Sequence, residues 1–234
     1  MSDLTVIYYT SNYASPYFLA NTLAILKNAI GDLPVISVSH KPMDFGRNIC
    51  VGDIGRSHLN IYRQILIGAK AAETPYVALA EDDILYPASH FELRPSSMDV
   101  FNYDVNKWSL YTWYQPPTFS MLGNTVVHQL ISSRDYLVDD MQERFARFPD
   151  ESKINLSNWK DPGRGEELLG MEKRRRERAW SKEPTIAFSH EDAFGFLNLG
   201  KRKAHGKMRA DFLHPWGYAA DVLKLYQRRN EDNG

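Results

Sequence analysis

The chain has 234 residues, 43% of them hydrophobic and 24% charged, and its 28 Lys and Arg against 29 Asp and Glu give a net charge of −1. These values are typical of a globular domain and exclude intrinsic disorder, a collagen-like repeat and a coiled coil. A single cysteine, Cys50, excludes an intramolecular disulfide and a cysteine-rich zinc site. No signal-peptide pattern opens the chain, and no apolar run approaches the roughly 18 residues of a bilayer span. We therefore expect a cytoplasmic protein without a membrane span.

Apolar runs and amphipathic stretches alternate in the first third of the chain. Strands are predicted at Leu4–Thr10, 34–39 and 75–80, and helices at 16–30, after a Ser-Pro start, and at 54–72. This alternation favours a parallel sheet, whose ligands lie outside the carboxyl ends of the strands. The loops that follow the three strands should therefore face one site.

The pattern is less regular in the rest of the chain, and no internal repeat is visible. A polar segment that contains prolines and glycines is predicted to be a long loop, and such loops commonly bind ligands or close over them. The predicted elements are strands at 108–114, 125–132 and 185–188, helices at 133–148 and 166–179, and this loop at 149–165.

Three consecutive carboxylates, Glu81-Asp82-Asp83, follow the third predicted strand directly. Adjacent carboxylates repel one another unless a cation or solvent compensates them. At the carboxyl end of a buried strand they indicate a site for a hard divalent cation, which prefers oxygen ligands. A solvated acidic turn is the alternative interpretation.

Residues 4–92, above all VIYYTSN and NIYRQILIGAKAAETPYVALAEDDILYP, resemble the nucleotide-binding half of GT-A glycosyltransferases, especially those of the family-2 type. The resemblance implies an α/β fold with a Rossmann-like, mostly parallel central sheet flanked by helices. It implies that residues 1–92 bind a nucleotide sugar and that residues 93–234 form the acceptor-binding and catalytic half of the same domain. It also implies a divalent cation, Mn²⁺ or Mg²⁺, and a donor that we expect to be a UDP-sugar.

The resemblance also points to individual site residues. The acidic run stands where these enzymes carry an Asp-x-Asp motif, which makes Asp83 the principal candidate metal ligand. Many relatives have an aspartate that reads uracil after the second strand, whereas this chain has His40-Lys41-Pro42 there, so Asp44 or Asp53 would substitute. The candidate metal ligands are Asp83, Glu81 and His190, and the candidate donor-binding residues are Thr10, Ser11, Asp53, Arg56, Glu81, Asp82, Lys201 and Arg202.

Three carboxylates are candidates for the base that accepts the proton of the acceptor hydroxyl. Glu166 and Glu167 open the predicted charged helix, and His190 follows Glu167 by 23 residues, an order and spacing that resemble the acidic pair and histidine of these enzymes. Carboxylates at a helix N-terminus are also stabilised by the helix dipole, so a structural role is the alternative. Asp192 is the third candidate. A single base without a sugar-side nucleophile favours inversion at the anomeric carbon.

The charge of the chain is unevenly distributed. Residues 173–209 contain 11 Lys and Arg and four acids, a net charge of +7, which leaves −8 for the remainder. Such a segment suits a polyanionic acceptor, because phosphate neutralisation dominates nucleic-acid affinity. One hypothesis is therefore an acceptor in DNA, a hydroxymethylated pyrimidine such as those that bacteriophage enzymes glycosylate. The alternatives are a cell-surface glycan or lipid-linked acceptor, a nucleotidyltransferase, and a non-catalytic nucleic-acid-binding protein.

Overall fold

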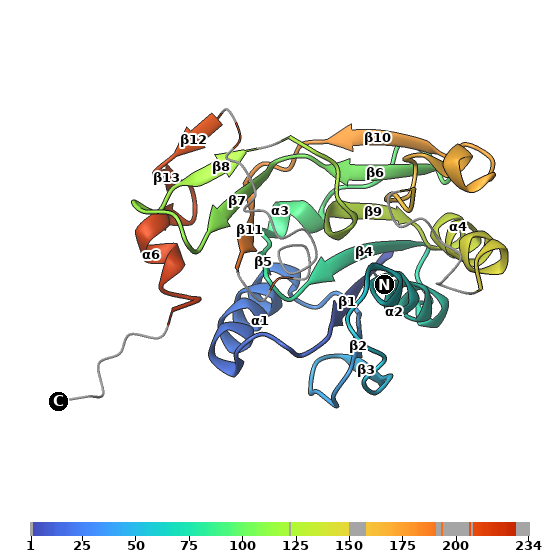
Figure 1. Cartoon of the computed structure of the whole chain (residues 1–234), viewed down its shortest axis with the longest axis horizontal. Helices are drawn as coiled ribbons and strands as arrows, with labels where there is room; N and C mark the ends of the chain where they lie inside the picture. The colour runs from blue at the N-terminus through green and yellow to red at the C-terminus, as the bar shows by residue number, and fades with distance from the viewer. Residues whose placement is uncertain are drawn as a thin grey trace.

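The computed structural model describes residues 2–121, 123–149, 158–190, 193, 206 and 208–227, and over these it forms a seven-stranded sheet, a five-stranded sheet and a two-stranded hairpin (Figure 1). The first half of the chain follows the predicted alternation closely. Its elements are β1 (Leu4–Thr10), α1 (Pro16–Ile30), β2 (Val35–Ser39), β3 (Arg47–Cys50), α2 (His58–Ala71), β4 (Tyr76–Glu81), β5 (Ile84–Leu85) and α3 (Ala88–Phe91).

Side-chain caps set the helix starts in this half. The Ser15 hydroxyl accepts a hydrogen bond from Phe18 N, and proline occupies the first position of α1. In α2 the Ser57 hydroxyl accepts from Asn60 N, so this helix begins four residues later than predicted. The intervening residues belong instead to the loop that enters the helix.

The large sheet has the order β10-β6-β9-β4-β1-β2-β3, with β6 at Val100–Asp104, β9 at Leu130–Ser133 and β10 at Arg175–Ala179. β1 is parallel to β2 and β4, β2 is parallel to β3, and β6 is parallel to β10, whereas β9 is antiparallel to both of its neighbours. The expected mostly parallel sheet is therefore confirmed.

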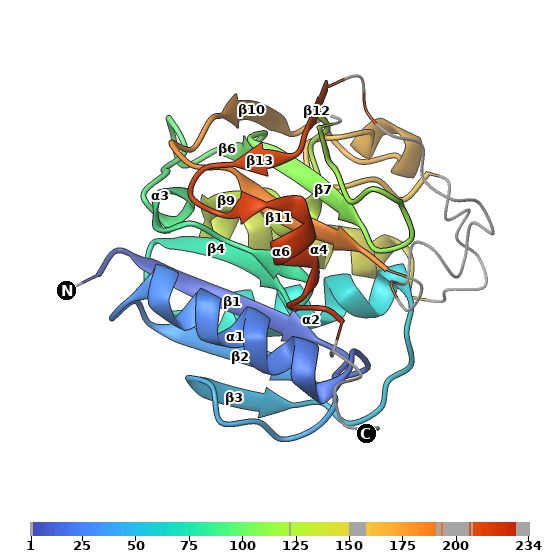
Figure 2. The same ribbon diagram turned by 90° about the vertical axis from the view of Figure 1, so that its left-hand side faces the viewer.

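Helices cover both faces of this sheet, as expected (Figure 2). Along β1, Val6 and Tyr8 pack with Leu26 of α1 on one face, whereas Ile7 and Tyr9 pack on the other face in the core that α2 and α4 (Arg134–Arg147) share. This alternation follows from the two-residue period of a strand. In the described part of the chain, no helix is long and apolar enough to span a membrane.

The second half builds the smaller sheet, whose order is β12-β8-β7-β11-β5. Because β11 pairs with both β7 and β5, it joins this sheet to the segment that follows β4. The elements are β7 (Lys107–Tyr111), β8 (Phe119–Met121), β11 (Thr185–Ser189), β12 (Met208–Ala210), β13 (Phe212–Leu213), β14 (Gly217–Tyr218), α6 (Ala219–Leu223) and a 3₁₀ turn at Val127–Gln129.

The predicted helix at 166–179 is wrong. Glu166–Leu169 form a single 3₁₀ turn, and Gly170, in the left-handed region at φ 68°, ends it. The charged residues that follow form β10, which pairs with β6 and is an edge of the large sheet. A strand edge tolerates such charge because its side chains reach solvent.

Candidate functional site

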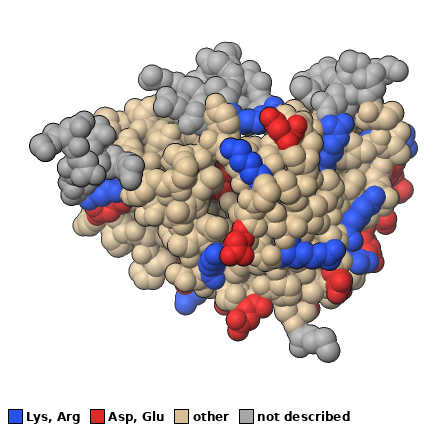
Figure 3. Space-filling view, turned by 90° about the horizontal axis from the view of Figure 1, so that it is seen from below, with Lys and Arg blue, Asp and Glu red and all other residues tan. Residues whose placement is uncertain are grey.

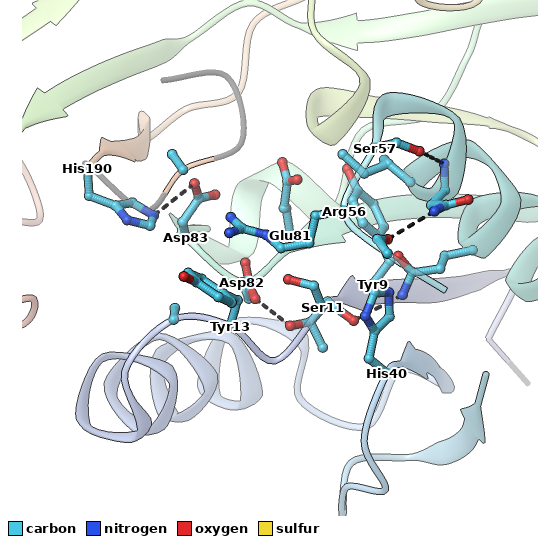
Figure 4. A pocket seen from close by; sticks show the side chains of 17 residues that line it. Tyr9, Ser11, Tyr13, His40, Arg56, Ser57, Glu81, Asp82, Asp83 and His190 are labelled. Carbon is cyan, nitrogen blue, oxygen red and sulfur yellow. Dashed lines mark hydrogen bonds and ion pairs between the residues drawn. The ribbon is translucent and has the colours of Figure 1, made fainter. Parts of the chain in front are cut away.

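A pocket opens at the carboxyl ends of β1, β2 and β4 (Figure 4). Thr10 and Ser11 line it from the end of β1, and His40 lines it from the end of β2. The convergence of the three loops that the sequence predicted is therefore confirmed. The lining also includes Tyr13, Arg56, Asn60, Ile61, Gln64, Glu81, Asp82, Asp83 and His190.

The pocket environment strongly perturbs the Asp82 carboxylate. Burial, and next to it the negative charge of Asp83, raise its pKa from the ordinary value to about 7, against the hydrogen bond that the Thr10 hydroxyl donates to its Oδ2. A cation in the pocket would relieve both causes of this shift. The electrostatics therefore fit an electropositive ligand.

Asp83 and His190 face each other across the pocket (Figure 4), with His190 Nε2 3.6 Å from Asp83 Oδ2. The chain brings them together because β11 pairs with β5, and Phe188 N donates to the backbone oxygen of Asp83. Carboxylate oxygen and imidazole nitrogen both ligate Mn²⁺-like cations. Asp83 and His190 thus fit a divalent cation as two ligands, although the described residues contain no cluster of three such side chains arranged to hold a metal.

Glu81, the third predicted metal ligand, is turned toward another partner. Its Oε2 lies 3.1 Å from Nδ1 of His128, on the 3₁₀ turn before β9. The backbone N–H of Glu81 donates to the hydroxyl of Tyr86. The carboxylate therefore lies on the wall of the pocket, in an ion pair with His128.

The other predicted donor-binding residues divide into two groups. Arg56 lines the pocket and stacks on Tyr13, with its guanidinium 3.8 Å from the ring centroid. Asp53 is an exposed residue outside the lining and lies 3.6 Å from Nδ1 of His40, whose pKa burial lowers. His40, and not Asp53, therefore faces the pocket. Lys201 and Arg202 lie outside the described residues.

A second pocket adjoins the first and shares Ile61, Glu81, Asp83 and Ala193 with it. Its further lining residues include His58, Tyr62, Lys107, Asn124, His128 and Asp161. No sequence pattern marks Asp161 as a site residue beyond its place in the predicted loop 149–165. Its position depends on contacts with α2, which a sequence does not display.

Neither glutamate predicted as the base lines these two pockets. Glu166 is buried, and its Oε1 accepts hydrogen bonds from Arg144 Nη2 and from Gly163 N, both at 2.6 Å. Arg144 is bound in turn to Asp140 at 2.7 Å. Glu166 therefore belongs to a buried ion-pair network, which is a structural role.

Glu167 lines a separate hollow with residues 163–166 and 173–177. The distance along the chain to His190 matched the expected spacing, but the 3₁₀ turn directs the two glutamates away from the Asp83 pocket. Asp192, the third candidate base, lies outside the described residues.

Among known proteins, the chain is similar to solved structures only. No protein-family model matches the chain, and no curated protein matches it. An active-site mutant of LgtC has a TM-score of 0.46 at 12% identity, with 94% of each chain covered. A glycosyltransferase involved in glycosylation of the major capsid of PBCV-1 has a TM-score of 0.43 at 11% identity, with 80% of this chain and 93% of that chain covered. Residues 1–349 of S. aureus TarS in complex with UDP-GlcNAc have a TM-score of 0.41 at 12% identity, and the match spans 82% of this chain and 60% of that chain.

Proposed function

We propose that this protein is a divalent-cation-dependent glycosyltransferase that moves a sugar from a nucleoside-diphosphate sugar to an acceptor hydroxyl. The observation that carries the proposal is the junction of two pockets at Glu81 and Asp83. A transferase must hold both substrates with their reacting atoms in contact, and two pockets with a common wall meet that requirement. The sequence resemblance supports a UDP-sugar as the donor.

The first pocket has the chemistry that a sugar nucleotide requires. Arg56 offers a guanidinium to the diphosphate, because its planar donors suit phosphate oxygens. Asp83 and His190 would hold the cation, which when bound neutralises the charge that develops on the departing diphosphate. The raised pKa of Asp82 supports a cation at this place.

The second pocket favours an uncharged sugar hydroxyl over DNA. Its lining contains three carboxylates, Glu81, Asp83 and Asp161, against one lysine, Lys107, and this excess of carboxylates disfavours phosphate. The positive charge of residues 173–209 is also partly neutralised, since Arg174 pairs with Glu143 and Arg175 pairs with Asp99. On the face shown in Figure 3, basic and acidic side chains are interspersed. A glycan or lipid-linked sugar therefore suits the site better than DNA does.

Titration calorimetry with UDP, with and without Mn²⁺, tests the donor and the cation together. We expect UDP to bind, and its affinity to rise when Mn²⁺ is present. Release of sugar from UDP-glucose, UDP-galactose and UDP-GlcNAc then tests for transfer to water. Absence of UDP binding ends the proposal, and consumption of a nucleoside triphosphate in place of a nucleotide sugar would identify a nucleotidyltransferase.

The stereochemistry and the acceptor have separate tests. We propose direct displacement with inversion, and proton NMR of the first-formed product reports the anomeric configuration, so retention would contradict it. For the acceptor, binding to duplex DNA is measured as salt is raised. A steep fall of log K with log salt would restore DNA as the acceptor, whereas no binding at low salt supports the glycan.

A further inference from the structure

Asp161 is a carboxylate of the second pocket to which the proposed function gives no catalytic role. Its side chain is 19% exposed, so it is shielded from bulk water and still reached from the pocket. It lines the pocket that also contains Glu81 and Asp83, next to the donor pocket. A carboxylate at this place borders the space where an acceptor hydroxyl would meet the sugar.

Tyr62 holds Asp161 in one orientation. The Tyr62 hydroxyl donates to Asp161 Oδ1 at 2.7 Å, and the ring packs edge-to-face on Trp159, with centroids 5.8 Å apart. Burial, and next to it the charge of Asp161, raise the pKa of Tyr62 well above its usual value, so the hydroxyl keeps its proton and donates. The second oxygen, Oδ2, has a looser contact at 3.4 Å with Arg164, which donates to Thr125 O at 2.8 Å.

The other carboxylates of this pocket lie beside imidazoles. Glu81 lies 3.1 Å from His128, and Asp83 faces His190 in the proposed cation site. Asp161 differs because its closest partner is the Tyr62 hydroxyl, whereas its ion pair with Arg164 is longer, at 3.4 Å. A carboxylate that a hydroxyl orients beside the space for the acceptor is suited to accept a proton.

We propose that Asp161 is the catalytic base of the transfer and that Tyr62 positions it. This inference rests on the proposed function. As the acceptor oxygen bonds to the anomeric carbon, its proton passes to Asp161. The bond from that carbon to the diphosphate oxygen breaks, and its electron pair leaves with the nucleoside diphosphate.

The test uses water as the acceptor and UDP-glucose, UDP-galactose and UDP-GlcNAc as donors, with Mn²⁺ and the full chain. Asp161→Asn keeps an acceptor for the Tyr62 hydroxyl, so we expect it to fold and to bind UDP as the parent does. Its kcat for hydrolysis should fall by about 10²- to 10⁴-fold, the usual contribution of general base catalysis, with KM for the donor little changed. Asp32→Asn, at an exposed carboxylate in the turn after α1, is the matched control.

Chemical rescue separates a base from a structural residue. Formate should restore part of the hydrolysis by Asp161→Ala, because a small carboxylate can occupy the vacated space and accept the proton. Tyr62→Phe should lose less turnover than Asp161→Asn, and formate should not rescue it. Unchanged kcat in Asp161→Asn, or no rescue of Asp161→Ala, overturns the inference.

Two further outcomes separate this inference from the proposed function. If the parent protein binds no UDP, the proposed function itself fails. If the parent binds UDP but hydrolyses none of the three donors, the donor site stands and Asp161 is not the base, because a base beside the anomeric carbon would activate water.

Discussion

Two acidic runs of this chain, Glu81-Asp82-Asp83 and Glu166-Glu167, look alike in sequence and differ in the structure. Asp82 lies in an open pocket, where burial and Asp83 raise its pKa to about 7 and a threonine hydroxyl is its hydrogen-bond donor. Glu166 is buried against the guanidinium of Arg144 and two backbone amides. Glu166 is buried, whereas Asp82 is partly exposed to the pocket, and of the two only Glu166 has an arginine bound to it at 2.6 Å.

We expect this difference to separate carboxylates that bind a ligand from carboxylates that stabilise the fold. A carboxylate that arginine neutralises contributes to the fold, and removing its partner leaves a buried charge. A carboxylate whose pKa is raised inside a cleft is a candidate for binding or catalysis. The four predictions below test this distinction, from the largest expected effect to the smallest.

Asp83→Ala should lower transfer or donor hydrolysis by more than about 10⁴-fold, equivalent to more than ~5 kcal/mol of transition-state stabilisation. The physical reason is loss of a ligand of the cation that offsets charge on the leaving group. Steady-state kinetics with Mn²⁺ measure the effect, and Asp99→Ala, which breaks an exposed ion pair with Arg175, is the control. Full activity of the variant, or of the parent in EDTA, contradicts the metal role.

Arg144→Met should lower the free energy of unfolding by about 3–5 kcal/mol, because it leaves Asp140 and Glu166 buried without their cation. Urea unfolding followed by circular dichroism measures the loss. Arg147→Met, which removes a more exposed partner of Glu143, should cost less than ~1 kcal/mol. If both variants lose the same free energy of unfolding, the buried network contributes no more to stability than the exposed ion pair does.

His190→Ala should weaken Mn²⁺ binding by roughly 10- to 100-fold, because it removes a side chain that would ligate the cation. Titration of Mn²⁺ followed by electron paramagnetic resonance measures the affinity directly. His214→Ala, on the segment between β13 and β14, provides a histidine control. Unchanged Mn²⁺ affinity in His190→Ala would remove this imidazole from the site.

Glu167→Gln should change turnover by less than about twofold, because its side chain lines a hollow apart from both pockets. The same hydrolysis assay measures it. A loss comparable to that of Asp161→Asn would return the base to Glu167 and require a conformation different from the one described.

Local signals predicted most of the first half of the fold. The bounds of β1 were predicted correctly because an apolar, β-branched run indicates a strand without knowledge of its neighbours. Ser15 and the proline that follows it marked the start of α1. β3, β6 and β8 were missed because their assignment depends on pairing with distant strands. The charged strand β10 was mistaken for a helix because its edge position, which admits four charged residues in succession, is a property of the sheet.

In the site, too, residues placed by topology were predicted, whereas residues placed by distant side-chain contacts were not. Thr10 and Asp82 could be placed in one pocket from topology alone, since parallel strands end at one edge of a sheet. The sequence left a structural role for Glu166 open but could not identify its partner, because Arg144 is brought to it by the packing of α4 against the segment around Trp159. Asp161 was missed for a similar reason, as its position depends on Tyr62 of α2.

The wall that the two pockets share has a consequence for kinetic order. Ile61, Glu81 and Asp83 border both pockets, so a ligand in one pocket alters the boundary that the other ligand meets. Such coupling acts equally in both directions. Double-reciprocal plots for donor and acceptor should therefore intersect instead of running parallel, the signature of a ternary complex. UDP that remains after turnover should compete with the donor and slow the next cycle.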